Sequence, residues 1–163
     1  MKCKEWKILR VDEALLDAAS EVHAESWRAS HAEFCAPDFV ATHTARRQRA
    51  YLRRKMENGS RYFLLCAPEP VGIVSVNGNL IEDLYVLPSR QGKGYGTALL
   101  CHAVRACAGS PTLWILETNQ RARRLYERLG FRPTGAVNRN NGPLAEIEFV
   151  MQPTANEEQN REV

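Results

Sequence analysis

The sequence predicts a mixed α/β fold with a central pair of parallel strands. Segments in which apolar residues recur with helical period alternate with short β-rich segments, and a glycine-rich turn separates a strand from a helix near the middle of the chain. A right-handed crossover around this turn puts the strands 79–87 and 112–117 side by side and parallel. The glycine turn then lies at the carboxyl end of a strand, where α/β sheets bind ligands.

The other elements follow from apolar periodicity and from turn residues. Asp12 is a suitable N-cap for the first helix, Pro37 breaks the run that follows it, and Asn58-Gly59 is a helix stop. Helices are expected at residues 12–30, 44–57, 94–108 and 119–129. Strands are expected at residues 6–10, 62–66, 71–76, 79–87, 112–117, 131–138 and 144–151, the last two joined by a polar turn at 138–142.

The composition is that of an ordinary globular protein. Of the 163 residues, 44% are hydrophobic and 25% are charged, which suits one domain over residues 1–153. The polar residues 154–163 are expected to form a frayed tail. The formal net charge of +3 fits a polyanionic small ligand and is too small to indicate nucleic-acid binding by itself.

The cysteines indicate a reducing compartment. Their number, five, is odd and they lack C-x-x-C spacing, which favours buried free thiols over a disulfide framework or a zinc ribbon. The N-terminus lacks the apolar run of a signal peptide, and no stretch approaches the ~18 apolar residues of a membrane span. We therefore expect a cytoplasmic protein with no membrane segment and no metal site.

The turn at residues 88–97, PSRQGKGYGT, is suited to bind a diphosphate. Gly92, Gly94 and Gly96 alternate, so consecutive backbone N–H groups can face one concavity, and the following helix adds its free N–H groups and its positive dipole end. Arg90 and Lys93 add positive charge. The P-loop and dinucleotide fingerprints fit less well, because their lysine–hydroxyl pair and third glycine are not at the required positions. A glycine turn without a ligand is the alternative interpretation.

Two motifs in order resemble the GNAT superfamily of acetyl-CoA-dependent N-acetyltransferases. Gln91, Gly94 and Gly96 match Q-x-x-G-x-G after an apolar strand, and residues 119–131, NQRARRLYERLGF, match N-x-x-A-x-x-x-Y-x-x-x-G-F. The similarity covers roughly residues 71–150. It implies a mostly antiparallel sheet with a central parallel strand pair, flanked by helices, and direct transfer of acetyl from acetyl-CoA to a primary amine.

The resemblance also implies which residues hold the cofactor. The backbone of the strand before the loop would pair with the pantetheine arm, the loop would hold the pyrophosphate, and Asn119 would contact the pantetheine as well as capping its helix. The implied cofactor-binding residues are Leu84, Tyr85, Val86, Gln91, Gly92, Lys93, Gly94, Tyr95, Gly96, Thr97, Asn119 and Ala122.

Catalytic roles are expected for Tyr126 and Glu82. Tyr126 matches the family tyrosine that protonates the leaving thiolate, although its helical stripe also fits a core residue. Glu82 is favoured as the general base: alternation puts it on the face of Leu84 and Val86 and puts Asp83 on the opposite face, unless a bulge changes the phase. His23 and His31 are alternative bases.

The acceptor is expected to contact the first two helices and their loop. Candidate contact residues there are Trp27, His31 and Phe34, although core packing would explain these side chains equally well. The last hairpin, residues 138–146, would close the other wall. Small-molecule and peptide amines both remain open, as does a homodimer.

The sequence also allows two alternatives to an enzyme. A nucleic-acid or ribosome-binding module would use the basic helix at 44–57, although a solvated basic face is the commoner explanation. The second alternative is an inactive GNAT fold that binds acyl-CoA without transferring the acyl group. The intact loop motif and Tyr126 argue against this alternative.

Overall fold

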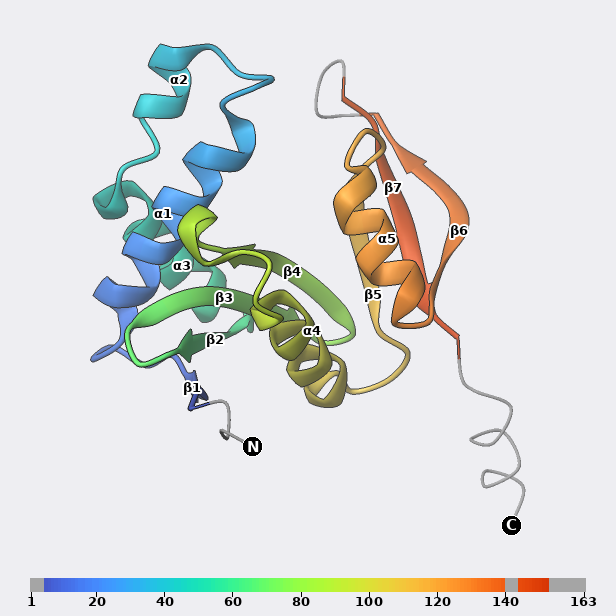
Figure 1. Ribbon diagram of the computed structural model, residues 1–163, viewed down its shortest axis with the longest axis horizontal. Coiled ribbons are helices and arrows are strands. Elements are labelled where there is room, and N and C mark those ends of the chain that lie inside the picture. The colour runs from blue at the N-terminus through green and yellow to red at the C-terminus, as the bar shows by residue number, and fades with distance from the viewer. Residues whose placement is uncertain (1–4, 140–143, 153–163) are drawn as a thin grey trace.

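The computed structural model describes residues 5–139 and 144–152, which form a seven-stranded sheet in the order β1-β2-β3-β4-β5-β7-β6. Neighbouring strands are antiparallel except for the parallel pair β4–β5 (Figure 1). This confirms the predicted fold class. The strands are β1 (Lys7–Arg10), β2 (Arg61–Cys66), β3 (Pro70–Asn77), β4 (Leu80–Val86), β5 (Thr112–Leu116), β6 (Phe131–Asn138) and β7 (Glu146–Met151).

Helices cover both faces of the sheet, with a core on each side. The helices are α1 (Leu16–His31), α2 (Pro37–Ala41), α3 (Ala45–Glu57), the 3-10 turn η1 (Pro88–Arg90), α4 (Tyr95–Ala106) and α5 (Gln120–Arg128). One core joins the sheet to α4 and α5, and the other joins it to α1 and α3. Strands β2 and β3 are buried on both faces, which explains their nearly continuous apolar sequences.

Side-chain capping fixes the starts of α3 and α5. Thr44 accepts from the Arg47 N–H at 3.2 Å and starts α3, and Asn119 accepts from the Ala122 N–H at 3.1 Å and starts α5. The first helix begins later than predicted, because Asp12 caps a preceding turn and the regular helix starts at Leu16. Pro37 does not simply break the chain: it opens the short helix α2, since proline is well suited to a first helical turn.

A bulge in β4 changes the orientation of its acidic residues. Ser75 pairs with Glu82 and Ile73 pairs with Tyr85, so β4 contains one more residue than β3 over this interval, and Asp83 has a φ of 47°. Glu82 and Asp83 both face α1 and α3, where they contact Lys55 and His23. The predicted opposite faces for these two residues are therefore wrong.

The same bulge separates Glu82 from its expected neighbours. Leu84 and Val86 pack in the core under α4 and α5, whereas Glu82 lies on the other side of the sheet. The prediction that Glu82 shares a face with Leu84 and Val86 is wrong, because strict alternation holds only in a regular strand.

Strands β4 and β5 separate soon after they meet. They pair only at Leu80–Thr112 and Ile81–Leu113, whereas β5 continues along β7 as far as the pair Leu116–Glu146. Beyond Ile81, β4 therefore has no strand partner on its β5 side, and the sheet opens toward the glycine loop.

Some predicted segments fall outside the residues that the structure describes. The tail at 154–163 and most of the turn at 138–142, with the tip of the 138–146 hairpin, are outside the described residues. Within 5–139 and 144–152, no helix is both long and apolar enough to cross a bilayer.

Candidate active site

The glycine loop adopts a conformation that exposes backbone donors. Gly92 and Gly94 have φ values of 75° and 85°, and Gly94 is the N-cap of α4, so the left-handed backbone requires glycine at both positions. The Gln91 side chain donates to the Val86 carbonyl at 3.3 Å and accepts from Arg121 at 2.6 Å. These bonds tie the loop to β4 on one side and to α5 on the other.

A cavity of about 500 Å³, here called the loop cavity, lies between this loop, β4 and α5. The predicted cofactor-binding residues all line it except Tyr85 and Lys93. Tyr85 instead faces α1, where its ring lies 5.2 Å from that of His23. Among the described residues, the loop cavity is lined by four arginines and by no acidic side chain: Arg90, Arg121, Arg124 and Arg128.

Three of these arginines were not anticipated from the sequence. Arg121, Arg124 and Arg128 are spaced i, i+3 and i+7, which puts them on one face of α5. That spacing was the available signal. Positive side chains on this face, together with the free N–H groups of the loop, make the loop cavity suitable for a ligand with several phosphates.

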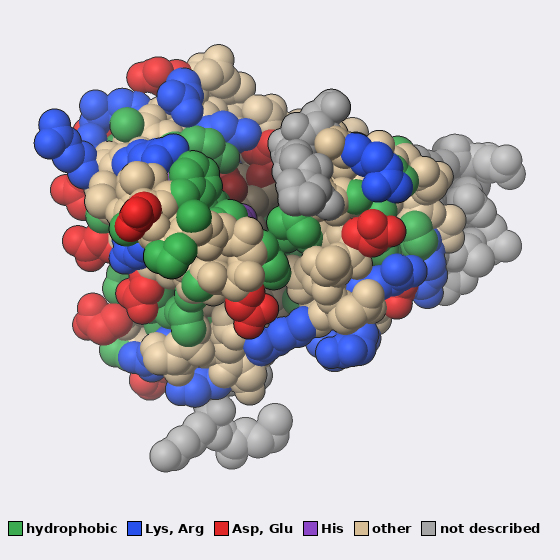
Figure 2. Space-filling model, turned by 90° about the horizontal axis from the view of Figure 1, so that it is seen from above, with side chains coloured by type: hydrophobic (Ala, Val, Ile, Leu, Met, Phe, Trp, Pro, Cys, Tyr) green, Lys and Arg blue, Asp and Glu red, His purple; other side chains and the backbone are tan. Residues whose placement is uncertain are grey.

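A second cavity of about 220 Å³, here called the strand cleft, lies in the opening between β4 and β5. Glu82, Asp83 and Glu146 line it, and none of its described lining residues is Lys or Arg. Figure 2 shows acidic side chains and a histidine inside the hollow on this side of the molecule. The strand cleft and the loop cavity share four lining residues: Leu84, Asn119, Ala122 and Tyr126.

Tyr126 is buried where these two cavities meet. Its side chain is 8% exposed and its ring centroid lies 6.0 Å from that of Phe131. Burial raises the pKa of Tyr126 to about 12. The phenol is therefore protonated at neutral pH and is able to act as a proton donor.

Asp83 is the centre of a buried polar cluster. Its carboxylate accepts from the Tyr62 hydroxyl at 2.6 Å and from the Tyr51 hydroxyl at 3.3 Å, and its other oxygen lies 3.5 Å from Nε2 of His23. Burial favours a raised pKa, but His23, the Tyr62 hydroxyl and Lys55 outweigh it and hold the pKa of Asp83 below its usual value. Asp83 therefore remains ionised.

Glu82 also lines the strand cleft, and Lys55 Nζ lies 2.7 Å from its carboxylate. Both side chains are partly buried, so this ion pair is better shielded from solvent than a surface pair. Lys55 thus fixes the Glu82 carboxylate at the cleft.

The three candidate acceptor residues separate into two locations. His31 and Phe34 line the strand cleft, whereas Trp27 does not. Trp27 is stacked between two imidazoles, with centroid distances of 3.9 Å to His31 and 3.5 Å to His43. Burial lowers the pKa of His31, which favours its neutral form. His43 was not singled out from the sequence, because nothing local signals a stack between residues so far apart in the chain.

Part of the chain is similar to known acetyltransferases. Residues 58–133 match the family model described as an acetyltransferase (GNAT) domain. The peptidyl-lysine N-acetyltransferase YjaB of Escherichia coli is 32% identical over 95 residues, which cover 53% of this chain and 64% of that protein. The chain thus spans less than two thirds of this curated relative.

Solved structures agree with the fold. A Corynebacterium glutamicum protein described as histone acetyltransferase HPA2 and related acetyltransferase superposes with a TM-score of 0.72 at 19% identity, covering 91% of this chain and 97% of that one. The PaiA N-acetyltransferase of Thermoplasma acidophilum in complex with coenzyme A gives a TM-score of 0.66 at 18% identity, covering 88% and 98%. The match of residues 58–133 to a GNAT acetyltransferase domain agrees with the resemblance found in the motifs of the chain.

Proposed function

We propose that the protein is an acetyl-CoA-dependent N-acetyltransferase. The observation that carries this proposal is the meeting of two oppositely charged cavities at Leu84, Asn119, Ala122 and Tyr126. The arginine-lined loop cavity suits a polyanionic donor, and the carboxylate-lined strand cleft suits a cationic amine. A group-transfer enzyme needs such a junction, because donor and acceptor must be brought into contact.

The residues of the loop cavity fit coenzyme A. The N–H groups of the loop and of the first turn of α4 would bind the pyrophosphate, with arginines of α5 close to the remaining phosphate charge. The pantetheine arm would run along Leu84 and Val86 toward Asn119, where β4 has no partner strand. Bound acetyl-CoA would supply an activated acetyl thioester. Relatives support this assignment, since the PaiA structure contains coenzyme A.

Acetylation of an ammonium group requires two protons to leave its nitrogen. One proton ends on the thiol of coenzyme A and the other is released to solvent. Tyr126, protonated and located at the junction, is the proposed donor to the leaving sulfur. Backbone N–H groups of β4 beyond Ile81 are available to stabilise the developing oxyanion.

Glu82 is the proposed general base, directly or through water. Its carboxylate lines the strand cleft and is held by Lys55. Asp83 is less suited to this step, because its lowered pKa makes it a weaker proton acceptor. We assign to Asp83 the electrostatic attraction of the ammonium group, with His31 and Phe34 at the opposite wall of the cleft.

Further assignments stay within this proposal. The chain would act in the cytoplasm, which agrees with the free thiols of Cys35, Cys66, Cys101 and Cys107. The described residues would form one acetyltransferase domain, and a homodimer is a prediction that light scattering would test. A peptide lysine is one acceptor to try, because YjaB is named for that activity.

The first test is calorimetric titration with acetyl-CoA and with coenzyme A, followed by an amine panel assayed for thiol release. We expect both cofactors to bind, and at least one amine to accelerate thiol release above hydrolysis. Absence of binding at millimolar cofactor would refute the proposal. Binding without transfer to any amine would instead favour the inactive acyl-CoA-binding alternative.

A matched pair of variants on α5 tests the location of the donor. Arg124 lines the loop cavity, whereas Arg123 forms an ion pair with Glu127 and does not line it. Arg124→Gln should weaken coenzyme A binding by about tenfold, the effect of losing one charged contact to phosphate. Arg123→Gln should leave the affinity unchanged. Equal effects of the two changes would show that only the net charge of α5 matters.

A further inference from the structure

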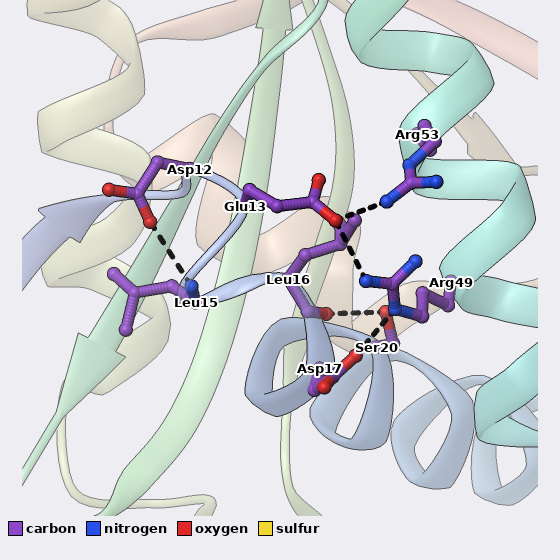
Figure 3. Close-up of polar contacts among 8 residues, drawn as sticks. All are labelled: Asp12, Glu13, Leu15, Leu16, Asp17, Ser20, Arg49 and Arg53. Carbon is purple, nitrogen blue, oxygen red and sulfur yellow. Dashed lines mark hydrogen bonds and ion pairs between the residues drawn. The ribbon is translucent and has the colours of Figure 1, made fainter.

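The cations of α3 do not form a uniform basic face. Arg49 contacts Glu13 and Asp17 and Arg53 contacts Glu13, at the start of α1 (Figure 3). Lys55 is paired with Glu82. None of the ion pairs in the described part of the chain involves Arg47 or Arg54.

Arg47 and Arg54 both line a cavity of about 480 Å³ between α1 and α3, here called the helix cavity. Trp27 and His43 line it as well, and Asp83 is the one described residue that lines both the helix cavity and the strand cleft. The two spaces therefore adjoin at Asp83. Since Tyr126 lines the strand cleft, the helix cavity is adjacent to the space in which we propose that the amine reacts.

One ring nitrogen of a buried histidine in the helix cavity lacks a partner among the described residues. His23 is 2% exposed and lines the cavity; its Nε2 lies 3.5 Å from the Asp83 carboxylate, whereas its Nδ1 has no hydrogen-bond partner in the described part of the chain. Buried polar groups are nearly always hydrogen-bonded to protein, water or ligand. The unpartnered Nδ1 thus points to an occupant of this cavity that carries polar atoms.

The electrostatic environment of the helix cavity favours an anion near its arginines. Asp83, the one carboxylate among the described residues that line it, is already engaged by Tyr51, Tyr62 and the neighbouring His23. Burial lowers the pKa of His43, and the charges of Arg47 and Arg28 lower it further. A positive potential at the His43 ring follows from these two arginines.

We propose that the helix cavity binds a carboxylate of the acceptor through Arg47 and Arg54, so that the acceptor is an amine that also carries a carboxylate, as in amino acids. Its ammonium group would lie in the strand cleft beside Asp83, and its carboxylate would lie on the arginine side. This inference rests on the proposed function, because it names the acceptor of that same site. It also accounts for the two cavity-lining arginines of α3, neither of which forms an ion pair with a described residue.

Calorimetry on the full chain saturated with coenzyme A tests the inference. The probes are ω-amino carboxylates from glycine to 6-aminohexanoate, each compared with the alkylamine and with the carboxylate of matching length. We expect one or more amino carboxylates to bind at least about tenfold more tightly than either partner compound, as expected when two charged contacts act together. Preference for the plain amines would overturn the inference.

Neighbouring arginines of α3 provide matched variants. Arg47→Gln and Arg54→Gln should each weaken amino-carboxylate binding by about tenfold, and Arg49→Gln and Arg53→Gln should not, because those two arginines contact Glu13 or Asp17 outside the cavity. Equal losses in all four variants would overturn the inference, since only the net charge would then matter. Equal binding of the carboxylate without an amine would identify a separate effector site and overturn the acceptor assignment.

An NMR titration of His43 gives a second readout that does not depend on turnover. Burial and the charges of Arg47, His23 and Arg28 each lower the pKa of His43, and its Nδ1 lies 3.4 Å from the hydroxyl oxygen of Thr42. A bound carboxylate favours the imidazolium, so saturation with the best probe should raise the pKa of His43. An unchanged value would contradict the assignment. If coenzyme A binds normally while no probe binds, this inference fails and the proposed function stands.

Discussion

Replacing Tyr126 by phenylalanine isolates one hydroxyl group at the junction of the two cavities. Tyr126 is 8% exposed and packs beside Phe131, and no hydrogen bond to its hydroxyl is present among the described residues. The ring contacts are retained in the variant. The free energy of unfolding should therefore change by no more than about 1 kcal/mol, because no buried partner loses its bond.

The effect on turnover should be much larger than the effect on stability. General acid catalysis typically contributes about 10²–10⁴-fold, and a thiolate is a better leaving group than an alkoxide, so the lower end is expected. We predict that Tyr126→Phe lowers kcat by at least about tenfold, which corresponds to about 1.4 kcal/mol in the activation free energy. The dissociation constant of acetyl-CoA should stay within about twofold of the wild-type value, because the hydroxyl serves the leaving group rather than the bound cofactor.

The assay is single-turnover thiol release with saturating acetyl-CoA and amine, so that the chemical step and not product release is observed. Thermal unfolding and cofactor titration are measured on the same preparation. Wild-type single-turnover rates in Tyr126→Phe would refute the role of proton donor and leave Tyr126 as a core aromatic. A large loss of stability or of cofactor affinity would instead indicate that the hydroxyl has a structural partner.

Three further predictions concern the loop and the buried polar cluster. Gly94→Asp should abolish coenzyme A binding in calorimetry while circular dichroism stays native, because a carboxylate would face the diphosphate from a residue with a φ of 85°; unchanged affinity would remove the phosphate from this loop. Asp83→Asn should lower the free energy of unfolding by about 1–3 kcal/mol at neutral pH, measured by urea titration. The folded pKa of Asp83 lies below the usual 3.8, so its stabilisation exists above that value and is lost as the pH falls through the folded pKa; a difference that persists in strong acid would contradict this origin. Burial raises the pKa of Tyr62 and Tyr85, so these tyrosines lose their protons at a lower pH in the unfolded chain than in the folded protein. The free energy of unfolding should therefore fall as the pH rises above 10.0. An ultraviolet titration in which Tyr62 and Tyr85 of the folded protein ionise with the ordinary pKa of 10.0 would refute their burial.

Local signals made most of the fold predictable. Thr44 and Asn58 mark both ends of α3, and the switch from helical period to continuous apolar runs marks β2 and β3. The short helix α2 was missed because Pro37 was interpreted only as a break, although the fixed φ of proline suits a first helical turn. The glycine loop was the easiest part of the site to predict, because its residues are contiguous and the left-handed backbone requires glycine at Gly92 and Gly94.

The acceptor side could be predicted only in part, because its geometry depends on contacts between distant segments. Of the three residues predicted to contact the acceptor, His31 and Phe34 line the strand cleft, whereas Trp27 lies against His43 and lines the helix cavity. The pattern of the basic helix favours a solvated basic face over a nucleic-acid surface, but it does not show that Arg49 and Arg53 contact acidic residues of another segment. A one-dimensional pattern does not distinguish a paired arginine from one that lines a cavity.

The bulge at Asp83 links the fold to the proposed chemistry. A regular β4 would have put Glu82 with Leu84 and Val86 on one face, and the same face would then have carried both the base and the path of the donor. The extra residue puts Glu82 and Tyr85 toward α1 and α3 and keeps Leu84 and Val86 toward the loop cavity. A non-glycine residue with positive φ costs about 1–3 kcal/mol, and the hydrogen bonds from Tyr51 and Tyr62 to the ionised Asp83 are of a size to offset that cost. The carboxylate that stabilises the bulge is also the one that lies between the strand cleft and the helix cavity, so the stability of this strand and the proposed binding of an acceptor involve the same side chain.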